Sequence, residues 1–318
     1  MNESHVDRLE GAFRFKRFTI RQTRCPMKVG TDGVLLGAWV EVRPSDRRIL
    51  DIGTGTGLIA VMLAQRSPEA LITGVDIDDV TEARENGDAS PWGDRLRFEQ
   101  TPIQDFFPAE RYDLIVSNPP FYVDSLTCPD RGRTTARHAV DLSYGELIDA
   151  VVRLLAPGGR FGVVLPTSEA ERFRRQAAAR LGLLRLTQVR TTPRRPVKRV
   201  LMEFSPIPSP GAATISAAVT TPGPVPNSAA ITVPASAPGS VPDSAVPASA
   251  PAPVSVSVAI LAMHPSISFA AASVPPATAA VTASNPGPQI DELIIGTGQH
   301  ETYTPEYRAL TGDFYLKF

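Results

Sequence analysis

One short apolar run, followed at once by alternating glycines, constrains the fold more than any other feature of this chain. Residues 48–52 carry the pattern of a buried strand, and Gly53-Thr54-Gly55-Thr56-Gly57 turns it directly into an apolar helix over residues 58–65. A strand that feeds a helix through a tight glycine loop is typical of α/β folds with a mostly parallel sheet. Ligands of such sheets bind at the carboxyl ends of the strands. We therefore expect a binding site at the end of this strand.

Further apolar runs extend this pattern along the chain. They predict strands at residues 71–75, 95–101, 112–116, 161–165, 200–204 and 292–295, so that the sheet has seven strands. A helix is expected after the second strand, over residues 81–89, but Gly87 and Asp88 lie within it and weaken the prediction. The sequence thus indicates a Rossmann-like α/β domain.

The residues around the glycine loop favour one nucleotide cofactor over another. A dinucleotide fingerprint needs glycine at the third position after Gly55, where this chain has Leu58. Asp51, at the end of the strand, would repel a pyrophosphate, but its carboxylate could accept hydrogen bonds from the ammonium group of an amino acid. Asp76 ends the next strand and is placed to bind ribose hydroxyls. The pattern therefore predicts S-adenosylmethionine rather than NAD, with Gly53 and Gly55 beside it.

An acidic residue after the third strand could complete this site. Asp105 follows the strand in a short loop and could accept a hydrogen bond from an adenine amine. A single aspartate in a loop is also a common turn former, and that alternative stays open.

The fourth strand ends abruptly in Ser117-Asn118-Pro119-Pro120-Phe121. The amide oxygen of Asn118 and the carbonyl oxygen of Pro119 could accept both hydrogens of a planar amine, and Phe121 could stack on the ring that bears it. The two prolines stop the strand, so a simple strand-ending turn is the alternative interpretation. The functional interpretation makes Asn118, Pro119, Pro120 and Phe121 the catalytic group.

A long segment of biased composition interrupts the domain. Residues 205–289 consist mostly of Pro, Ala, Ser, Val and Thr, and Asp243 is the one formally charged side chain among them. Such a segment cannot build a packed core and is expected to be disordered. We therefore predict one domain, formed by residues 1–204 and 290–318, with an insertion at 205–289.

Composition also bears on compartment and partners. The apolar stretch 253–263 is too short to cross a bilayer, and residues 1–10 lack the pattern of a secretion signal. Cys25 and Cys128 have neither the spacing of metal ligands nor that of a disulfide framework, which favours the cytoplasm. No metal site and no membrane contact are predicted, and a monomer is favoured.

The net charge of −1 gives no overall attraction for nucleic acid, so any such partner needs local basic patches. Candidate patches lie at Arg14–Lys28, where phenylalanines alternate with cations, at Arg131–His138 and at Arg194–Arg199. A solvated edge strand and a solvated turn are the alternatives for the first and the last.

Several of these motifs together resemble one enzyme family. The resemblance rests on Phe15-Lys16-x-Phe18, on Met27-Lys28-Val29-Gly30-Thr31-Asp32-Gly33 and the apolar residues up to Trp39, on Leu50 to Gly57, on Ser117 to Phe121, and on the tail from Tyr303 to Phe318. The chain is similar, over residues 10–204 and 290–318, to the bacterial valine-tRNA adenine-N6 methyltransferases.

That resemblance implies a class I methyltransferase fold, with seven strands and an antiparallel last hairpin, and S-adenosylmethionine as the methyl donor. It implies that Asp51, Gly53 and Gly55 contact the methionine part of the cofactor, that Asp76 contacts its ribose, and that Asp105 contacts its adenine. The target would be the adenine that follows the anticodon of valine tRNA, position 37, held by Asn118 to Phe121. Other planar nitrogens, namely a guanine amine, a DNA adenine or a glutamine side chain, remain alternative targets, and a non-catalytic interaction protein is a further one.

Overall fold

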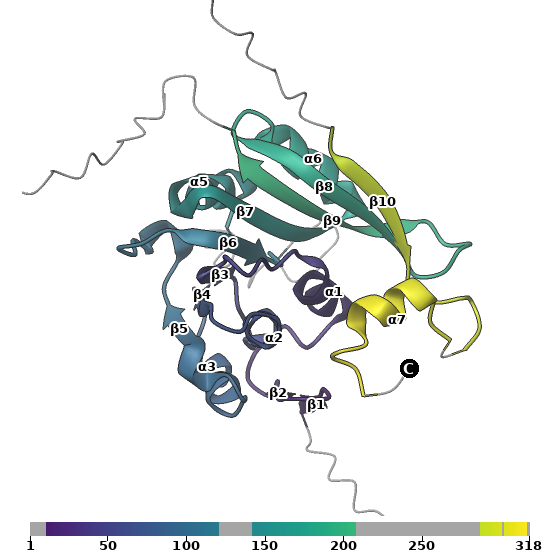
Figure 1. The fold of residues 1–318 in the computed structure, drawn as a ribbon, viewed down its shortest axis with the longest axis horizontal. Coiled ribbons are helices and arrows are strands. Elements are labelled where there is room, and N and C mark those ends of the chain that lie inside the picture. Colours follow the sequence, from purple (N-terminus) through teal and green to yellow (C-terminus); the bar gives the residue numbers. More distant parts are fainter. Residues whose placement is uncertain (1–10, 121–141, 208–286, 301, 317–318) are drawn as a thin grey trace, which may run out of the picture. The chain divides into compact units, whose positions relative to one another are not determined.

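A sheet of eight strands carries the fold (Figure 1), and its order is β10-β8-β9-β7-β6-β3-β4-β5. The structure, a computed structural model, describes residues 11–120, 142–207, 287–300 and 302–316. Five strands form the parallel part: β3 (Arg48–Ile52), β4 (Leu71–Asp76), β5 (Leu96–Gln100), β6 (Tyr112–Ser117) and β7 (Leu155–Pro166). These strands follow the apolar runs from which they were predicted.

Of the remaining three strands, β9 and β10 correspond to the strands predicted at residues 200–204 and 292–295, whereas β8 was not predicted. β8 (Leu181–Arg190) and β9 (Val197–Pro206) form the antiparallel hairpin, and β10 (Gln289–Ile294) lies outside them, parallel to β8. The sheet therefore has eight strands instead of seven, and β8 was missed. Its polar side chains obscured the strand pattern, and the structure shows why they are tolerated: Arg185 pairs with Glu203 of β9, and the hydroxyl of Thr187 accepts a hydrogen bond from Trp39 at 2.9 Å.

This arrangement also changes the place of the biased segment. The prediction made residues 200–204 and 292–295 adjacent strands joined by that segment. In the structure β8 lies between β9 and β10, so the segment links two strands that do not pair. Most of residues 205–289 lie outside the described residues, and the division into one domain with an insertion stays a prediction.

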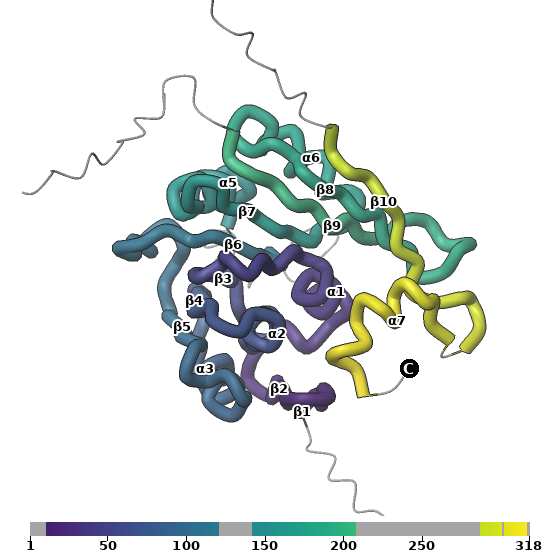
Figure 2. Tube along the Cα trace, in the orientation of Figure 1, coloured from purple at the N-terminus to yellow at the C-terminus, as the bar shows by residue number. Residues whose placement is uncertain are grey.

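Helices cover both faces of the sheet, as Figure 2 shows. One core contains side chains of α1 (Thr31–Trp39), α2 (Leu58–Arg66), α3 (Thr81–Asp88) and α7 (Pro305–Thr311), and the other contains those of α5 (Tyr144–Leu154) and α6 (Thr167–Ala177). Successive residues of β3 alternate between them, with Ile49 in the first core and Leu50 in the second. The sheet is thus buried on both faces, as its uninterrupted apolar strands require.

Helix α3 forms although its composition is poor, because tertiary contacts hold it. The Glu82 carboxylate accepts hydrogen bonds from the backbone N–H groups of Thr23, Arg24 and Cys25. Gly87 packs so tightly on Phe98 that a Cβ there would lie 2.7 Å from the ring. The glycine that weakens the helix in isolation is therefore what lets the helix approach the sheet.

The basic segment near residue 14 forms a small hairpin of β1 (Ala12–Arg14) and β2 (Thr19–Arg21). Phe15 and Phe18 are buried and stack on each other with centroids 4.5 Å apart, so these two rings belong to the core and do not face a base. The cations Arg14, Lys16, Arg17, Arg21, Arg24 and Lys28 are exposed. Among the described residues, no helix combines the length and apolar character needed to cross a membrane.

Candidate active site

Three neighbouring strands bring the predicted residues to one edge of the sheet. In β3, Ile52 pairs with Val75 of β4 on one side and with Ser117 of β6 on the other. The glycine loop, Asp76 and Asn118 follow these positions directly. The carboxyl ends of the strands therefore meet where the sequence predicted a site.

Asp51 is a fully buried carboxylate with an incomplete set of partners. Its Oδ2 accepts a hydrogen bond from the Thr54 hydroxyl at 2.8 Å, while its Oδ1 has no hydrogen-bond partner in the described part of the chain. Burial raises the pKa of Asp51 to about 7, and the nearby charge of Asp76 acts in the same direction. A buried acceptor without a donor is costly, so Asp51 fits a cationic ligand group that supplies one.

The glycine loop presents its backbone beside this carboxylate. Gly53 and Gly55 have φ angles of 72° and 54°, in the left-handed region that other residues adopt at a cost. A Cβ on Gly53 would meet no atom within 4 Å, so the space above this glycine is open to a ligand.

Asp76 holds the same loop from the next strand. Its Oδ2 accepts a hydrogen bond from the Gly55 N–H at 2.8 Å, and its Oδ1 accepts one from the Asp78 N–H at 3.0 Å. Burial raises the pKa of Asp76 as well. Each carboxylate oxygen has further acceptor capacity, which is compatible with the predicted grip on ribose hydroxyls.

A cavity of about 390 Å³ lies at this edge. It is lined by residues from four parts of the chain that are distant in sequence, including Met27, Asp32, Gly53, Gly55, Asn118 and Arg199. Asp51 and Asp76 do not line it themselves, but the residues they bond, Thr54 and Gly55, do. Asp105 is exposed and does not line it, so its predicted contact with the cofactor's adenine stays a prediction.

Asn118 contributes a second acceptor without a donor. Its Oδ1 is buried and has no hydrogen-bond partner among the residues that the structure describes, and its Nδ2 lies 3.9 Å from the Met27 sulfur. The Ser117 hydroxyl fixes the strand end by donating to the Ile52 carbonyl at 2.9 Å. Pro119 is buried and Pro120 is exposed, while Phe121 lies outside the described residues. A residue that lines the cavity thus has an amide oxygen that lacks a donor in the described part of the chain.

Comparison with known proteins identifies this arrangement. Residues 33–172 match the Methyltransferase small domain family. A protein of Trichodesmium erythraeum named tRNA1(Val) (adenine(37)-N6)-methyltransferase is 49% identical over 201 residues, which are 61% of this chain and 83% of the relative. A protein of the same name from Bacteroides thetaiotaomicron is 47% identical over 61% of this chain and 83% of its own length. The chain belongs to the family of these two relatives.

Membership of the tRNA1(Val) (adenine(37)-N6)-methyltransferase family confirms the predicted family and enzyme class. A predicted O-methyltransferase from Agrobacterium tumefaciens, only 13% identical, shares the fold with a TM-score of 0.51 and covers 89% of this chain and 96% of its own. This likeness concerns the fold alone, and it agrees with the predicted methyltransferase fold class.

Three residues of the candidate site were not predicted individually. Thr54 was treated only as part of the glycine loop, although its hydroxyl is the donor to Asp51. Met27 contacts Asn118, and Asp32 of α1 forms an ion pair of 2.6 Å with Arg199 of β9 in the cavity wall. Met27 and Asp32 both belong to the motif that carried the family resemblance. That motif is the signal that could have placed them at the site.

Proposed function

We propose that this chain transfers the methyl group of S-adenosylmethionine to the exocyclic N6 of an adenine in tRNA, namely the adenine at position 37 of valine tRNA. The observation that carries the proposal is that Asn118, which lines the cavity beside the glycine loop, has a buried amide oxygen without a donor among the described residues. The names of the relatives supply the target, and they favour it over a guanine amine, a DNA adenine or a glutamine side chain.

The residues around the glycine loop fit the cofactor. Asp51 Oδ1 is an acceptor for the ammonium group of its methionine part, Gly53 and Gly55 allow a close approach, and Asp76 accepts from its ribose. Asp105 is proposed to accept from its adenine. When bound, S-adenosylmethionine supplies an electrophilic methyl group.

The protein's own contribution to the reaction is proposed to come from Asn118 and Pro119. The N6 of adenine is a weak nucleophile because its lone pair is delocalised into the ring. Two acceptors, Asn118 Oδ1 and the Pro119 carbonyl, can hold both of its hydrogens and stabilise the positive charge that develops on nitrogen during methyl transfer. They also orient the amine for attack. The methylated nitrogen is cationic and strongly acidic, so it loses its extra proton to solvent without a general base of tuned pKa. Pro120 stiffens the clamp, and Phe121 is proposed to stack on the base.

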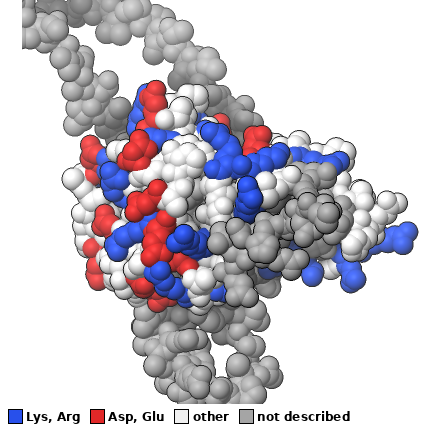
Figure 3. All heavy atoms as spheres, turned by 90° about the horizontal axis from the view of Figure 1, so that it is seen from below, with Lys and Arg blue, Asp and Glu red and all other residues white. Residues whose placement is uncertain are grey.

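Exposed cations are proposed to bind the tRNA backbone. They lie in the first hairpin, including Arg14, Arg17 and Arg21, and in the turn between β8 and β9, which contains Arg194 and Arg195. Figure 3 shows acidic and basic side chains mixed over the left part of one face. Basic ones project at its right-hand edge, which is the side of the β8–β9 turn in Figure 1. The patch at Arg131–His138 lies outside the described residues. The enzyme is proposed to act as a monomer in the cytoplasm, where tRNA is modified.

Asn118→Ala tests the proposal because it separates chemistry from binding. The variant loses an acceptor that matters most as the amine becomes positively charged, so the single-turnover rate should fall by roughly 10²–10³. Wild-type protein, labelled S-adenosylmethionine and unmodified tRNA give the reference rate, and nucleoside analysis of the product should show N6-methyladenosine at position 37.

Cofactor affinity, measured by calorimetry, is the internal control and should change less than threefold in Asn118→Ala. An unchanged chemical rate in this variant would place the reaction elsewhere on the molecule. A wild-type product methylated on another base or another macromolecule would overturn the substrate.

A further inference from the structure

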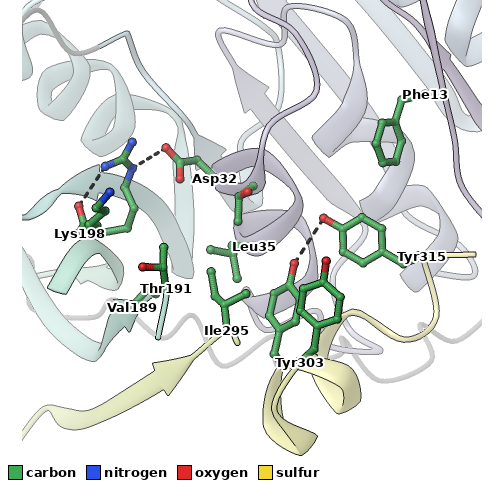
Figure 4. A pocket seen from close by; sticks show the side chains of 12 residues that line it. Phe13, Asp32, Leu35, Val189, Thr191, Lys198, Ile295, Tyr303 and Tyr315 are labelled. Carbon is green, nitrogen blue, oxygen red and sulfur yellow. Dashed lines mark hydrogen bonds and ion pairs between the residues drawn. The ribbon is translucent and has the colours of Figure 1, made fainter. Parts of the chain in front are cut away.

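A second and larger cavity adjoins the first. Its volume is about 560 Å³, and it shares Thr31, Asp32 and Arg199 with the cavity that contains Asn118. Figure 4 shows Asp32 and Lys198 at one side, Tyr303 and Tyr315 at the other, and Leu35 and Ile295 between them. Because one wall serves both cavities, a ligand in the larger one lies next to the methylation site.

Aromatic rings from the two ends of the chain form the second cavity. Tyr303 and Tyr307 lie with ring centroids 5.4 Å apart, and Phe13 meets Tyr315 edge-on at 6.3 Å. The hydroxyls of Tyr307 and Tyr315 are 3.4 Å apart, and burial raises the pKa of both phenols, so both stay neutral. Tyr303 is 37% exposed and stands at the surface. The site, called the tyrosine pocket below, thus offers flat rings together with polar hydroxyls.

Cations flank the tyrosine pocket. Lys198 is exposed and lines it, and Arg199 joins it to the methylation cavity through its ion pair with Asp32. Two further exposed cations, Arg194 and Arg195, lie in the turn that precedes β9. Planar rings for stacking beside cations for phosphates are the combination by which proteins bind bases of single-stranded nucleic acid.

We infer that the tyrosine pocket binds a second nucleobase of the same RNA strand, close to the adenine that is methylated. This inference rests on the proposed function and deepens it, because it makes recognition depend on two bases. The shared wall explains why the two sites are neighbours, and the volume lies in the range of small-ligand sites. A second base held there would help to draw the target adenine out of its stack.

Tyr303→Ala tests the inference with little risk to the fold, because the side chain stands at the surface. An anticodon stem-loop RNA is titrated onto the wild type and the variant, and the dissociation constant should rise about 5- to 100-fold, the usual loss for one stacked base. Tyr303→Phe keeps the ring and should bind within twofold of wild type. Ile290→Ala removes an exposed apolar side chain of β10, 63% accessible, and is the control for a general surface effect.

A thermodynamic cycle identifies the base. Single abasic sites are introduced at each position around the target adenine, and each RNA is titrated onto both proteins. The inference requires one abasic position at which Tyr303→Ala causes no further loss, because the stacking partner is already absent.

Additive losses at every position would overturn the inference. Normal RNA binding by Tyr303→Ala would overturn it too. So would a change in RNA affinity that only the removal of residues 317 and 318 produces, because the end of the chain would then be the occupant of the tyrosine pocket. The methylation assay separates the two proposals: if wild-type protein methylates position 37 while Tyr303→Ala binds RNA normally, only the tyrosine pocket inference fails.

Discussion

Asp46 and Asp51 are buried carboxylates at opposite ends of strand β3, and they have very different partners. Asp46, 5% exposed, accepts a charged hydrogen bond from Arg160 at 2.6 Å and another from the Arg43 N–H at 2.7 Å. Asp51 is fully buried and accepts one hydrogen bond from a neutral hydroxyl, while its second oxygen has no partner among the described residues. The same costly burial is thus compensated at one end of the strand and left incomplete at the other.

A network of charges surrounds Asp46 at the amino end. Arg160, only 1% exposed, also pairs with Glu203 at 3.4 Å, and Glu203 pairs with Arg185 at 3.2 Å. Burial raises the pKa of Glu203, but both arginines lower it. The Thr54 hydroxyl and the Ala60 backbone N–H lower the pKa of Asp51 and the Asp76 carboxylate raises it, but among the described residues only the hydroxyl forms a hydrogen bond with the Asp51 carboxylate. At the amino end the buried carboxylate has a cationic partner, although Arg160 Nε lacks a hydrogen bond in the described structure, and this pairing marks a structural site. Asp51 has no cationic partner among the described residues, and its missing donor marks a place where a ligand can supply one.

Asp46→Ala should give the largest effect of the comparison on stability. It leaves a buried guanidinium with one carboxylate fewer, and the free energy of unfolding should fall by about 3 kcal/mol, at the lower end of the usual cost because Glu203 remains. Urea unfolding of wild type and variant measures it. Cofactor affinity of the folded variant should be unchanged.

Glu69→Ala is the matched control at the same end of the sheet. Glu69 forms an ion pair with Arg47, but both side chains are more than half exposed, so the loss should stay below about 1 kcal/mol. Equal losses of unfolding free energy in Asp46→Ala and Glu69→Ala would show that the buried ion pair is no more stabilising than an exposed one, and this would contradict the comparison.

Local patterns explain what the sequence could predict. The strand and glycine loop from Arg48 to Gly57 place Asp51 through consecutive residues, and Asn118 follows a strand whose apolar run is uninterrupted. The parallel order then brings both to one edge, since that edge is common to all parallel strands. Fold class and site location therefore follow from short stretches.

Contacts between distant residues explain what the sequence could not predict. Arginine is seldom fully buried, so nothing around Arg160 indicated a network that joins residues from three parts of the chain. Strand β8 was missed because its arginines pair with acidic residues of neighbouring strands, and the sequence alone did not bring these residues together. The tyrosine pocket likewise combines Phe13 with Tyr303 and Tyr315. Its lining residues carry no common spacing.

The pH dependence of cofactor binding tests the Asp51 side of the comparison between Asp46 and Asp51, and its expected effect is smaller than that of Asp46→Ala. Binding of an ammonium group requires ionised Asp51, whose pKa is raised to about 7, so affinity should fall about tenfold for each pH unit below this value. Calorimetry between about pH 5.5 and pH 7.5 measures it, below the range in which an α-amino group titrates. Asp51→Asn should bind more weakly at pH 7.5 and lose most of the dependence. A pH-independent wild type would show that Asp51 is ionised without a ligand.

Stability without cofactor should show the opposite sign. A carboxyl group whose pKa is higher in the folded than in the unfolded state binds more protons when folded, so stability falls as pH rises from about 4, the unfolded value, to about 7. The raised pKa of Asp76 acts in the same direction. Asp51→Asn should therefore flatten the pH dependence of unfolding only in part.

Thr54→Val should give the smallest effect and tests whether the one donor to Asp51 matters. Valine keeps the shape but removes the hydroxyl that bonds Oδ2 at 2.8 Å, so the ionised carboxylate loses about 1 kcal/mol and its pKa rises further. The pH at which cofactor affinity begins to fall should move upward by about half to one unit. Thr56→Val, a change of the same shape in the same loop, should leave this pH in place, because no hydrogen bond joins that hydroxyl to Asp51 in the described structure. An equal shift in both variants would mean that packing of the loop, and not the hydrogen bond from Thr54, sets the pKa of Asp51.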